Sequence, residues 1–309
     1  MTEAEMGAPW INPEMQQLIE WRDQDIVISV PIKSGTTWMM NIVYQLLTGG
    51  NTDFTDIYAE VPWIEFVQRP GQPVDELLER LDAMPTDRPR AFKTHSAPPV
   101  VPYIKPGEGK NVRYIVVARN PEEALVSAKP FFEKHTDAFY DFWGVPKEAV
   151  TRPDLVSFYD EVVDPQGMHK MLFGFLASWW PLRHEDNVLF LHFADMKRDY
   201  EDCIHRVAEF LDVQLTPDQW RGVFQYTSFP WMKKHEDRFE ARTQSDPPVL
   251  ESGAMVRKGK AGAAQEDGMT PEISRHLRAV GEQVYPHQDA LRWFYQGGLP
   301  DSPGADFRS

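Results

Sequence analysis

The sequence predicts an α/β fold in which helices flank a central parallel β-sheet. Residues 26–30, 112–118 and 187–193 are short apolar runs of the kind that forms strands buried on both faces. Residues 38–47, which follow the first run after a polar turn, are apolar almost all round, as expected of a helix that lies against a sheet. This succession of strands and helices is typical of a parallel sheet.

Weaker patterns predict the remaining elements. We expect one more strand at 90–94, and helices at 13–20, 74–84, 121–129, 168–185, 198–211, 217–226, 270–283 and 286–295.

The length of 309 residues and an apolar content of 42% are sufficient for one large domain, and no Gly/Ser-rich linker divides the chain. We therefore expect a single domain over 1–309. Residues 51–90 and 129–170 are predicted to be insertions that shape a substrate site, and 230–262, which is charged and lacks a helical period, is predicted to be a lid.

The single cysteine, Cys203, excludes an internal disulfide and a thiolate metal cluster, which favours a reducing compartment. Residues 1–10 carry neither the basic nor the apolar part of a secretory signal, and the most apolar later run, 171–182, is too short for a membrane span and contains a proline. We therefore expect a cytoplasmic protein without a membrane span.

The formal net charge of −15 argues against nucleic-acid binding, which needs a broad positive surface. It does not exclude a small anionic ligand. Cations gathered in a cleft outweigh a distant acidic surface, because salt screens distant charges beyond about 10 Å.

The turn at 33–37, KSGTT, has the composition of a phosphate site. Its backbone N–H groups, hydroxyls and ammonium group would lie at the N-terminus of a helix, where the helix dipole favours an anion, and Gly35 would let the backbone come close. The spacing is not that of the Walker pattern, because Lys33 precedes the glycine. Residues that only cap an ordinary helix are the alternative interpretation.

The strand at 90–94 ends in Lys93, Thr94 and His95. If this end is extended, Lys93 and His95 point to the same face, because alternate residues of a strand share a side. Open α/β sheets bind ligands at the carboxyl ends of their strands, so a cation and a base would meet where a ligand is expected.

The strand at 112–118 runs into Arg119, followed by an asparagine, a proline and two glutamates, which together are a strong helix start. The helix would carry Ser127 and end before Pro130. Arg119 is either a salt-bridge partner at the strand end or an anion ligand that uses its planar fork of donors.

Four segments resemble the cytosolic-type sulfotransferases, which move a sulfuryl group from 3′-phosphoadenosine-5′-phosphosulfate (PAPS) to a hydroxyl acceptor. KSGTTW at 33–38, KTH at 93–95, RNPEEALVS at 119–127 and RKGKAG at 257–262 occur in the family's order. The resemblance implies the P-loop nucleoside-kinase-like fold of that family, and PAPS as co-substrate with 3′,5′-ADP (PAP) as product.

The resemblance also implies the role of individual residues. His95 would be the general base, Lys33 would act at the leaving phosphate, and Lys93 at the sulfuryl oxygens, so that no metal is required. The donor would be bound at its 5′-phosphate by Lys33, Ser34, Gly35, Thr36 and Thr37, at adenine by Trp38, Phe193, Thr227 and Phe229, and at its 3′-phosphate by Arg119, Ser127, Arg257, Lys258 and Gly259.

The sequence departs from the family at several positions. Ile32 stands where the family usually has proline, Phe193 stands where it often has tyrosine, and Ala263 and Ala264 follow the basic loop in place of aspartate and tryptophan. The family's KxxxTVxxxE dimerisation motif is not evident, which leaves the oligomeric state open.

The segment 131–143 is dense in aromatic residues, which form either a second core layer or the wall of a pocket. The resemblance implies a pocket for a small-molecule acceptor that is mainly apolar, such as an alcohol, a phenol or a glycolipid. Its candidate residues are Phe131, Phe132, Phe139, Tyr140 and Trp143.

Two other functions fit part of the pattern. A nucleotide or small-molecule kinase of the P-loop fold would need Mg²⁺ and an acid at a neighbouring strand end, and a non-catalytic nucleotide-binding module would not need His95. The two His-Glu-Asp runs at 184–186 and 235–237 are not predicted to bind metal, because consecutive residues share no face of a helix or strand.

Overall fold

The computed structural model describes residues 8–242, 245–259 and 262–300. Within these residues it contains a four-stranded sheet in the order β2-β1-β3-β4, with every pair parallel. The strands are β1 (Ile26–Ser29), β2 (Ala91–Thr94), β3 (Arg113–Ala118) and β4 (Val188–His192). The predicted fold class is therefore confirmed, and each strand lies where the sequence places it.

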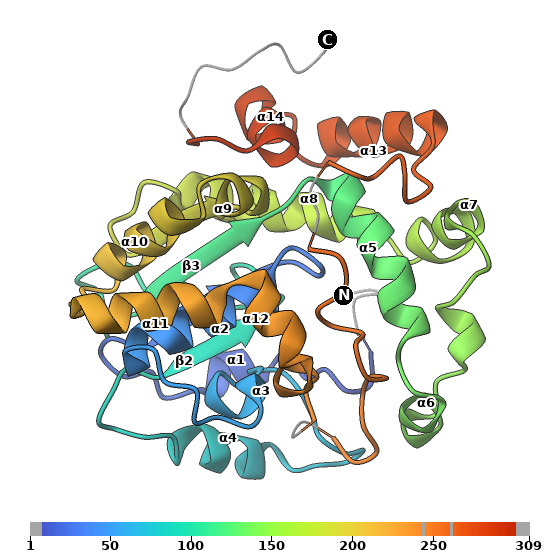
Figure 1. Cartoon of the computed structure of the whole chain (residues 1–309). Helices are drawn as coiled ribbons and strands as arrows, with labels where there is room; N and C mark the ends of the chain where they lie inside the picture. The colour runs from blue at the N-terminus through green and yellow to red at the C-terminus, as the bar shows by residue number, and fades with distance from the viewer. Residues whose placement is uncertain (1–7, 243–244, 260–261, 301–309) are drawn as a thin grey trace.

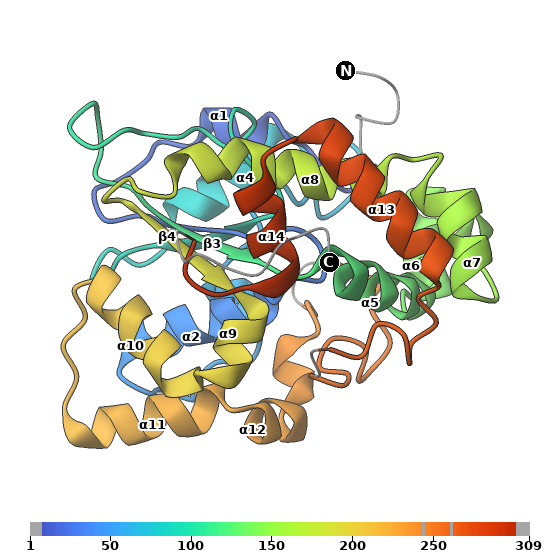
Figure 2. The same ribbon diagram turned by 90° about the horizontal axis from the view of Figure 1, so that it is seen from above.

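Helices cover both faces of the sheet, as Figure 2 shows. Alternate strand residues face opposite sides: Val27 and Val116 belong to one core cluster, and Ile28 and Val117 to the other. The first face packs against α5 (Pro121–Glu133), α8 (Met168–Trp179), α13 (Pro271–Val284) and α14 (Gln288–Gln296). The second packs against α2 (Thr36–Thr48), α9 (Phe193–Arg198), α10 (Tyr200–Phe210) and α11 (Pro217–Thr227).

Shorter helices complete the described part of the chain. They are α1 (Met15–Leu18), α3 (Ile57–Glu60), α4 (Val74–Asp82), α6 (Asp137–Trp143), α7 (Leu155–Phe158) and α12 (Phe229–Lys234). Short 3₁₀ turns occur at Lys147–Ala149, Trp180–Leu182 and Glu236–Phe239, and a π-helical turn occurs at Tyr159–Val163. In Figure 1 the arrows of β2 and β3 point toward the side of the molecule where α5 and α6 lie.

Two expectations about helices are wrong. The helix after Arg119 does not end before Pro130 but continues to Glu133. Proline in a helix interior removes one backbone hydrogen bond, and the aromatic contacts of the following turn, such as Phe132 with Phe158, compensate for that loss. The segment 230–262, which was expected to lack helix, contains most of α12 and the turn Glu236–Phe239.

Cys203 is a core thiol. It is 3% exposed on α10, and burial raises its pKa to about 11. Among the described helices, none combines the length and the apolar character that crossing a membrane requires.

A buried ion pair joins the beginnings of β1 and β2. Arg90 donates from Nη2 to Oδ2 of Asp25 at 2.6 Å and from Nε to Oδ1 at 2.9 Å, and both side chains are 1% exposed. The arginine also donates to the carbonyl oxygens of Glu20 and Leu81. The pair fixes the two strands that carry the phosphate turn and the Lys-Thr-His end.

The variant Arg90→Leu should lower the free energy of unfolding by about 3–5 kcal/mol, because it leaves the Asp25 carboxylate buried and unpaired. Urea unfolding measures this loss. The double variant Arg90→Leu/Asp25→Leu should recover most of it, whereas Arg69→Leu, which breaks an exposed pair with Glu76, should cost at most about 1 kcal/mol. A loss for Arg90→Leu no larger than that of the exposed control would contradict this role.

Candidate active site

A cavity of about 1180 Å³ lies at the carboxyl ends of β1, β2 and β3. Its walls include Lys33, His95, Arg119 and Arg257, which come from four separate parts of the chain. The cavity therefore brings together the basic and imidazole groups that the sequence analysis selected.

The turn between β1 and α2 has a backbone that few residues can adopt. Lys33 has a φ of +61° and Gly35 a φ of +104°, both in the left-handed region. A Cβ on Gly35 would lie 2.9 Å from the ring of Phe193, so no larger residue fits there without rearrangement. The turn is thus shaped for close approach of a ligand to the backbone.

Gly35 is the N-cap of α2 and supplies no side-chain cap. The first N–H groups of a helix have no partner within it, so those of Thr36, Thr37 and Trp38 suit an anion. All three residues line the cavity. Ser34 does not, because its side chain is fully buried and its N–H donates to the carbonyl oxygen of Pro31.

Lys93 and His95 lie side by side at the end of β2. Nδ1 of His95 is 2.7 Å from the carbonyl oxygen of Val30, which can only accept, so Nδ1 carries the proton. Nε2 therefore has a free lone pair and accepts from Nζ of Lys93 at 2.9 Å. Burial, followed by the charge of Lys93, holds the pKa of His95 well below its usual value of 6.5. The imidazole is neutral and can take up a proton.

Both lysines have strongly lowered pKa values. Burial is the main cause for each and lowers the pKa of Lys33 and of Lys93 to about 7. Their ammonium groups contact aromatic faces, with Nζ of Lys33 4.0 Å from the ring centre of Phe131 and Nζ of Lys93 3.5 Å from that of Trp63. An anionic ligand between them would restore their charge.

The carboxylate of Glu65 holds the end of β2 in place by accepting hydrogen bonds from it. Its Oε1 accepts from the hydroxyl of Thr94 at 2.8 Å and from the N–H of His95 at 3.1 Å. Its charge also raises the pKa of Lys93, against the effect of burial. The other oxygen, Oε2, is buried and has no hydrogen-bond partner in the described part of the chain.

A second basic group lies at the start of α5. Nε of Arg119 donates to Glu123 at 3.0 Å and Nη1 donates to the carbonyl oxygen of Lys33 at 3.1 Å, while the guanidinium lies 4.6 Å from the ring centre of Phe193. Ser127, two turns further along α5, also lines the cavity. The arginine is thus held between the phosphate turn and the helix.

The basic loop that begins at Arg257 is held over this helix start by carboxylates. Arg257 and Lys258 both pair with Asp267, and the N–H of Gly262 donates to Glu123. Arg257, Lys258 and Gly259 line the cavity, and Lys260 and Ala261 of the same basic run lie outside the described residues.

The aromatic side of the cavity is formed by Trp38, Phe193 and Phe229. The indole of Trp38 stacks on Tyr200 and donates from Nε1 to the carbonyl oxygen of Thr227 at 2.9 Å. Thr227 itself is fully buried, and its hydroxyl donates to the carbonyl oxygen of Val223. Thr227 therefore positions Trp38 and does not line the cavity.

Comparison with known proteins agrees with this geometry. Residues 23–288 match the family described as "Sulfotransferase domain". This chain is a sulfotransferase. It belongs to the PAPS-dependent family that its motifs resemble, and the kinase interpretation is excluded.

Relatives of the enzyme include Sulfotransferase 1A1 of Rattus norvegicus, 31% identical over 231 residues that cover 74% of this chain and 72% of the relative. Sulfotransferase 2A1 of the same species is 26% identical over 244 residues, 78% of each chain.

Solved structures show the same fold. Mouse sulfotransferase SULT7A1, complexed with PAP, has a TM-score of 0.68 at 19% identity and covers 94% of this chain and 93% of its own. Retinol dehydratase, in a complex with retinol and PAP, has a TM-score of 0.68 at 20% identity and covers 88% and 83%.

Some aromatic residues of the segment 131–143 line the cavity of the sulfotransferase, and others belong to its core. Phe131, Phe132 and Tyr140 line the cavity. Phe139 is fully buried and Trp143 is 8% exposed; both pack against Trp10 and do not line it.

Sequence reasoning missed several residues that line the cavity of this sulfotransferase, namely Tyr58, Trp63, Glu65 and His135. The first three lie in the 51–90 segment, which is held beside β2 by backbone hydrogen bonds of Lys93 with Pro62 and Ile64. The run VPWIEF at 61–66 could have indicated Glu65, since a carboxylate among apolar residues needs a partner. His135 is neutral, since burial lowers its pKa to about 4.

The free enzyme should become more stable as the pH rises from 7.5 to 9.5. In that range Lys33 and Lys93 are mostly deprotonated in the folded state, whereas in the unfolded chain they stay protonated up to their usual pKa of 10.5, so unfolding takes up protons. Chemical unfolding at several pH values measures the slope.

The variant Lys93→Met should lower this slope by up to about 1.4 kcal/mol per pH unit. Lys105→Met, which removes an exposed lysine, is the matched control and should leave the slope unchanged. Equal slopes for the wild type and Lys93→Met would show that Lys93 is not deprotonated in the folded enzyme.

Proposed function

We propose that the enzyme transfers the sulfuryl group of PAPS to a hydroxyl group of a mainly apolar small molecule, such as an alcohol, a phenol or a glycolipid. The observation that carries this proposal is that a neutral imidazole, two lysines and further basic groups all line the same cavity. Basic groups spread along one cavity match a ligand with phosphates at both ends of an adenosine.

The 5′ part of the donor fits the N-terminus of α2. Backbone N–H groups of Thr36, Thr37 and Trp38 and the hydroxyl groups of the threonines surround this point, and the ammonium of Lys33 lies beside it. The hydroxyl of Thr37 lies 3.3 Å from that of Tyr58, which limits its rotation. We assign the 5′-phosphate to this place.

The 3′-phosphate fits between α5 and the basic loop. Arg119, Ser127, Arg257, Lys258 and Gly259 all line this part of the cavity. Arg119 and Arg257 are close enough that each lowers the pKa of Lys33. A doubly charged phosphate would compensate this repulsion. The adenine ring then fits beside Trp38, between Phe193 and Phe229.

The chemical step follows from the position of His95. Nε2 takes the proton of the acceptor hydroxyl while its oxygen attacks the sulfur, and the bond between sulfur and the 5′-phosphate oxygen breaks, so that PAP leaves with the electron pair. Lys93 must leave Nε2 for this, and the sulfuryl oxygens give its ammonium a new partner. Lys33 compensates the charge that develops on the leaving phosphate.

The two lysines gain their full charge only with the donor. Their pKa of about 7 in the free enzyme rises when the negative phosphates and sulfuryl group come close. Because the cations are already placed, little reorganisation accompanies the reaction. On this proposal the transfer needs no metal ion.

The acceptor end of the cavity is apolar. Its walls come from the N-terminal segment, from 129–170 and from α8, and they include Trp10, Phe132, Tyr140, Val145, Met168 and Phe175. Retinol dehydratase, which shares the fold, has been crystallised with retinol and with androsterone. These ligands of a relative support an apolar alcohol as the acceptor here.

We also propose the domain organisation that the sequence indicated. One domain spans 1–309, and the segments 51–90 and 129–170 supply the acceptor side with residues such as Trp63 and Tyr140. The segment 230–262 acts as a lid that carries Arg257 onto the 3′-phosphate. The single, buried Cys203 supports a cytoplasmic location.

The variant His95→Gln should lose sulfuryl transfer by about 10²- to 10⁴-fold, because an amide cannot accept the proton of the acceptor. Binding of PAP, measured by calorimetry, should stay within a few-fold of the wild type. His205→Gln, which changes an exposed imidazole on α10, should keep full activity. A His95→Gln enzyme that turns over at the wild-type rate would refute the assignment of the base.

Among acceptors tested with labelled PAPS, those with an apolar body and a free hydroxyl should be sulfated. The panel should contain a simple phenol, a sterol-like alcohol, a glycolipid and, as the control, the free sugar that this glycolipid carries. The free sugar should be the poorest acceptor, because it cannot use the apolar wall of the cavity. Preference for the sugar over all three apolar compounds would contradict the proposed acceptor class.

A further inference from the structure

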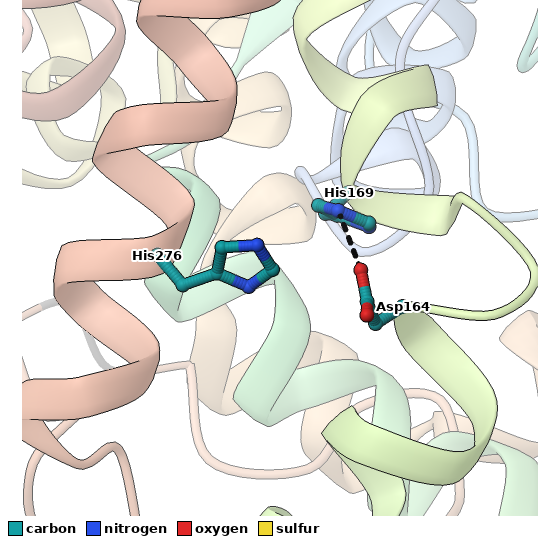
Figure 3. Close-up of side chains that lie close together, drawn as sticks. All are labelled: Asp164, His169 and His276. Atoms are coloured by element: carbon teal, nitrogen blue, oxygen red, sulfur yellow. Dashed lines mark ion pairs between the residues drawn. The ribbon is translucent and has the colours of Figure 1, made fainter.

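Figure 3 shows three side chains that lie close together and can bind a metal. Asp164 follows the helical turn Tyr159–Val163, His169 lies in the first turn of α8, and His276 lies on α13. One ligand atom of each lies within 4.8 Å of those of the other two. None of the three lines the cavity, so the cluster is separate from the transfer site.

The buried member of the cluster has unused donor atoms. His169 is 0% exposed, and within the described residues neither of its ring nitrogens makes a hydrogen bond of normal geometry, although the backbone of Val163 lies near the ring. Nε2 lies 3.2 Å from Oδ1 of Asp164, but the contact does not have the geometry of a hydrogen bond. A buried polar group without a partner is uncommon, which points to a ligand between the side chains.

Asp164 and His169 also carry the types of donor atom that a metal ion needs. A neutral imidazole and a carboxylate are both ligands for a metal cation.

His276 is oriented by a second residue. Its Nδ1 lies 2.9 Å from the hydroxyl of Tyr159, which is 3% exposed. When Nδ1 donates to this hydroxyl, the lone pair is on Nε2. Metal-binding histidines typically donate their other N–H to such an outer partner, which fixes both tautomer and ring orientation.

We propose that Asp164, His169 and His276 bind a divalent transition metal ion, Zn²⁺ in particular. Two imidazoles and one carboxylate are a donor set that zinc favours, and solvent can reach the remaining coordination position because Asp164 and His276 are exposed. Zinc at about 2.0–2.2 Å from its ligands holds the ligand atoms roughly 3.3–3.6 Å apart in a tetrahedral site. The contact between Asp164 and His169 is close to this value, and rotation of the exposed His276 side chain closes the remaining gap.

The ion would join α13 to the beginning of α8. Met168, Met171 and Leu172 on α8 line the cavity, so the ion would brace the helix behind the acceptor without contacting the donor. Its role is structural, and the transfer reaction proposed above does not depend on it.

Zinc binding can be measured on the untagged full-length enzyme after treatment with a chelator. Calorimetry should give one equivalent of Zn²⁺, and free Zn²⁺ at a hundred times its Kd should raise Tm by about 4 °C. Co²⁺ should bind in the same place and give the visible absorption of a low-coordinate site. PAP binding should be the same with and without Zn²⁺, which separates this result from the proposed function.

The variants His276→Ala and Asp164→Asn should each weaken Zn²⁺ binding at least tenfold, and both change exposed side chains, so the fold is retained. The matched controls His205→Ala and Asp202→Asn, which remove an exposed imidazole and an exposed carboxylate of α10, should bind one equivalent as the wild type does. The proposal is overturned if the wild type binds no zinc or if all four variants bind it equally.

Discussion

Two ammonium groups enclosed at the ends of neighbouring strands are the constraint on which the rest of the site depends. Lys33 and Lys93 lie against aromatic rings, and burial lowers both of their pKa values to about 7. This arrangement costs stability in the free enzyme, because the unfolded chain would charge both groups. The same enclosure makes each group a strong partner for an anion, since a charge interacts more strongly where water is excluded.

The acidic character of the chain does not conflict with an anionic donor. The net charge of −15 belongs to the whole molecule, whereas the cavity gathers its cations locally. Two carboxylates hold these cations in place: Glu123 binds Arg119 and the N–H of Gly262, and Asp267 pairs with Arg257 and Lys258. A donor phosphate would compete with Asp267 for Arg257 and Lys258.

The sequence alone was enough to predict the features that depend on residues close together in the chain. The four strands, the turn at 33–37 and the shared face of Lys93 and His95 follow from local patterns. Features that depend on tertiary packing were missed or wrong, because distant segments create them. Examples are the carboxylate of Glu65 beneath His95, and the continuation of α5 through Pro130, which the surrounding aromatic packing stabilises.

Calorimetry on two nucleotides tests most directly whether one cavity holds both phosphates of a single adenosine. The wild type should bind 3′,5′-ADP at least about tenfold more tightly than 5′-AMP, because the 3′-phosphate adds charge-assisted hydrogen bonds. Arg257→Ala should remove most of that difference and leave the affinity for 5′-AMP unchanged. Equal affinities of the wild type for the two nucleotides, or equal weakening of both by Arg257→Ala, would contradict the account.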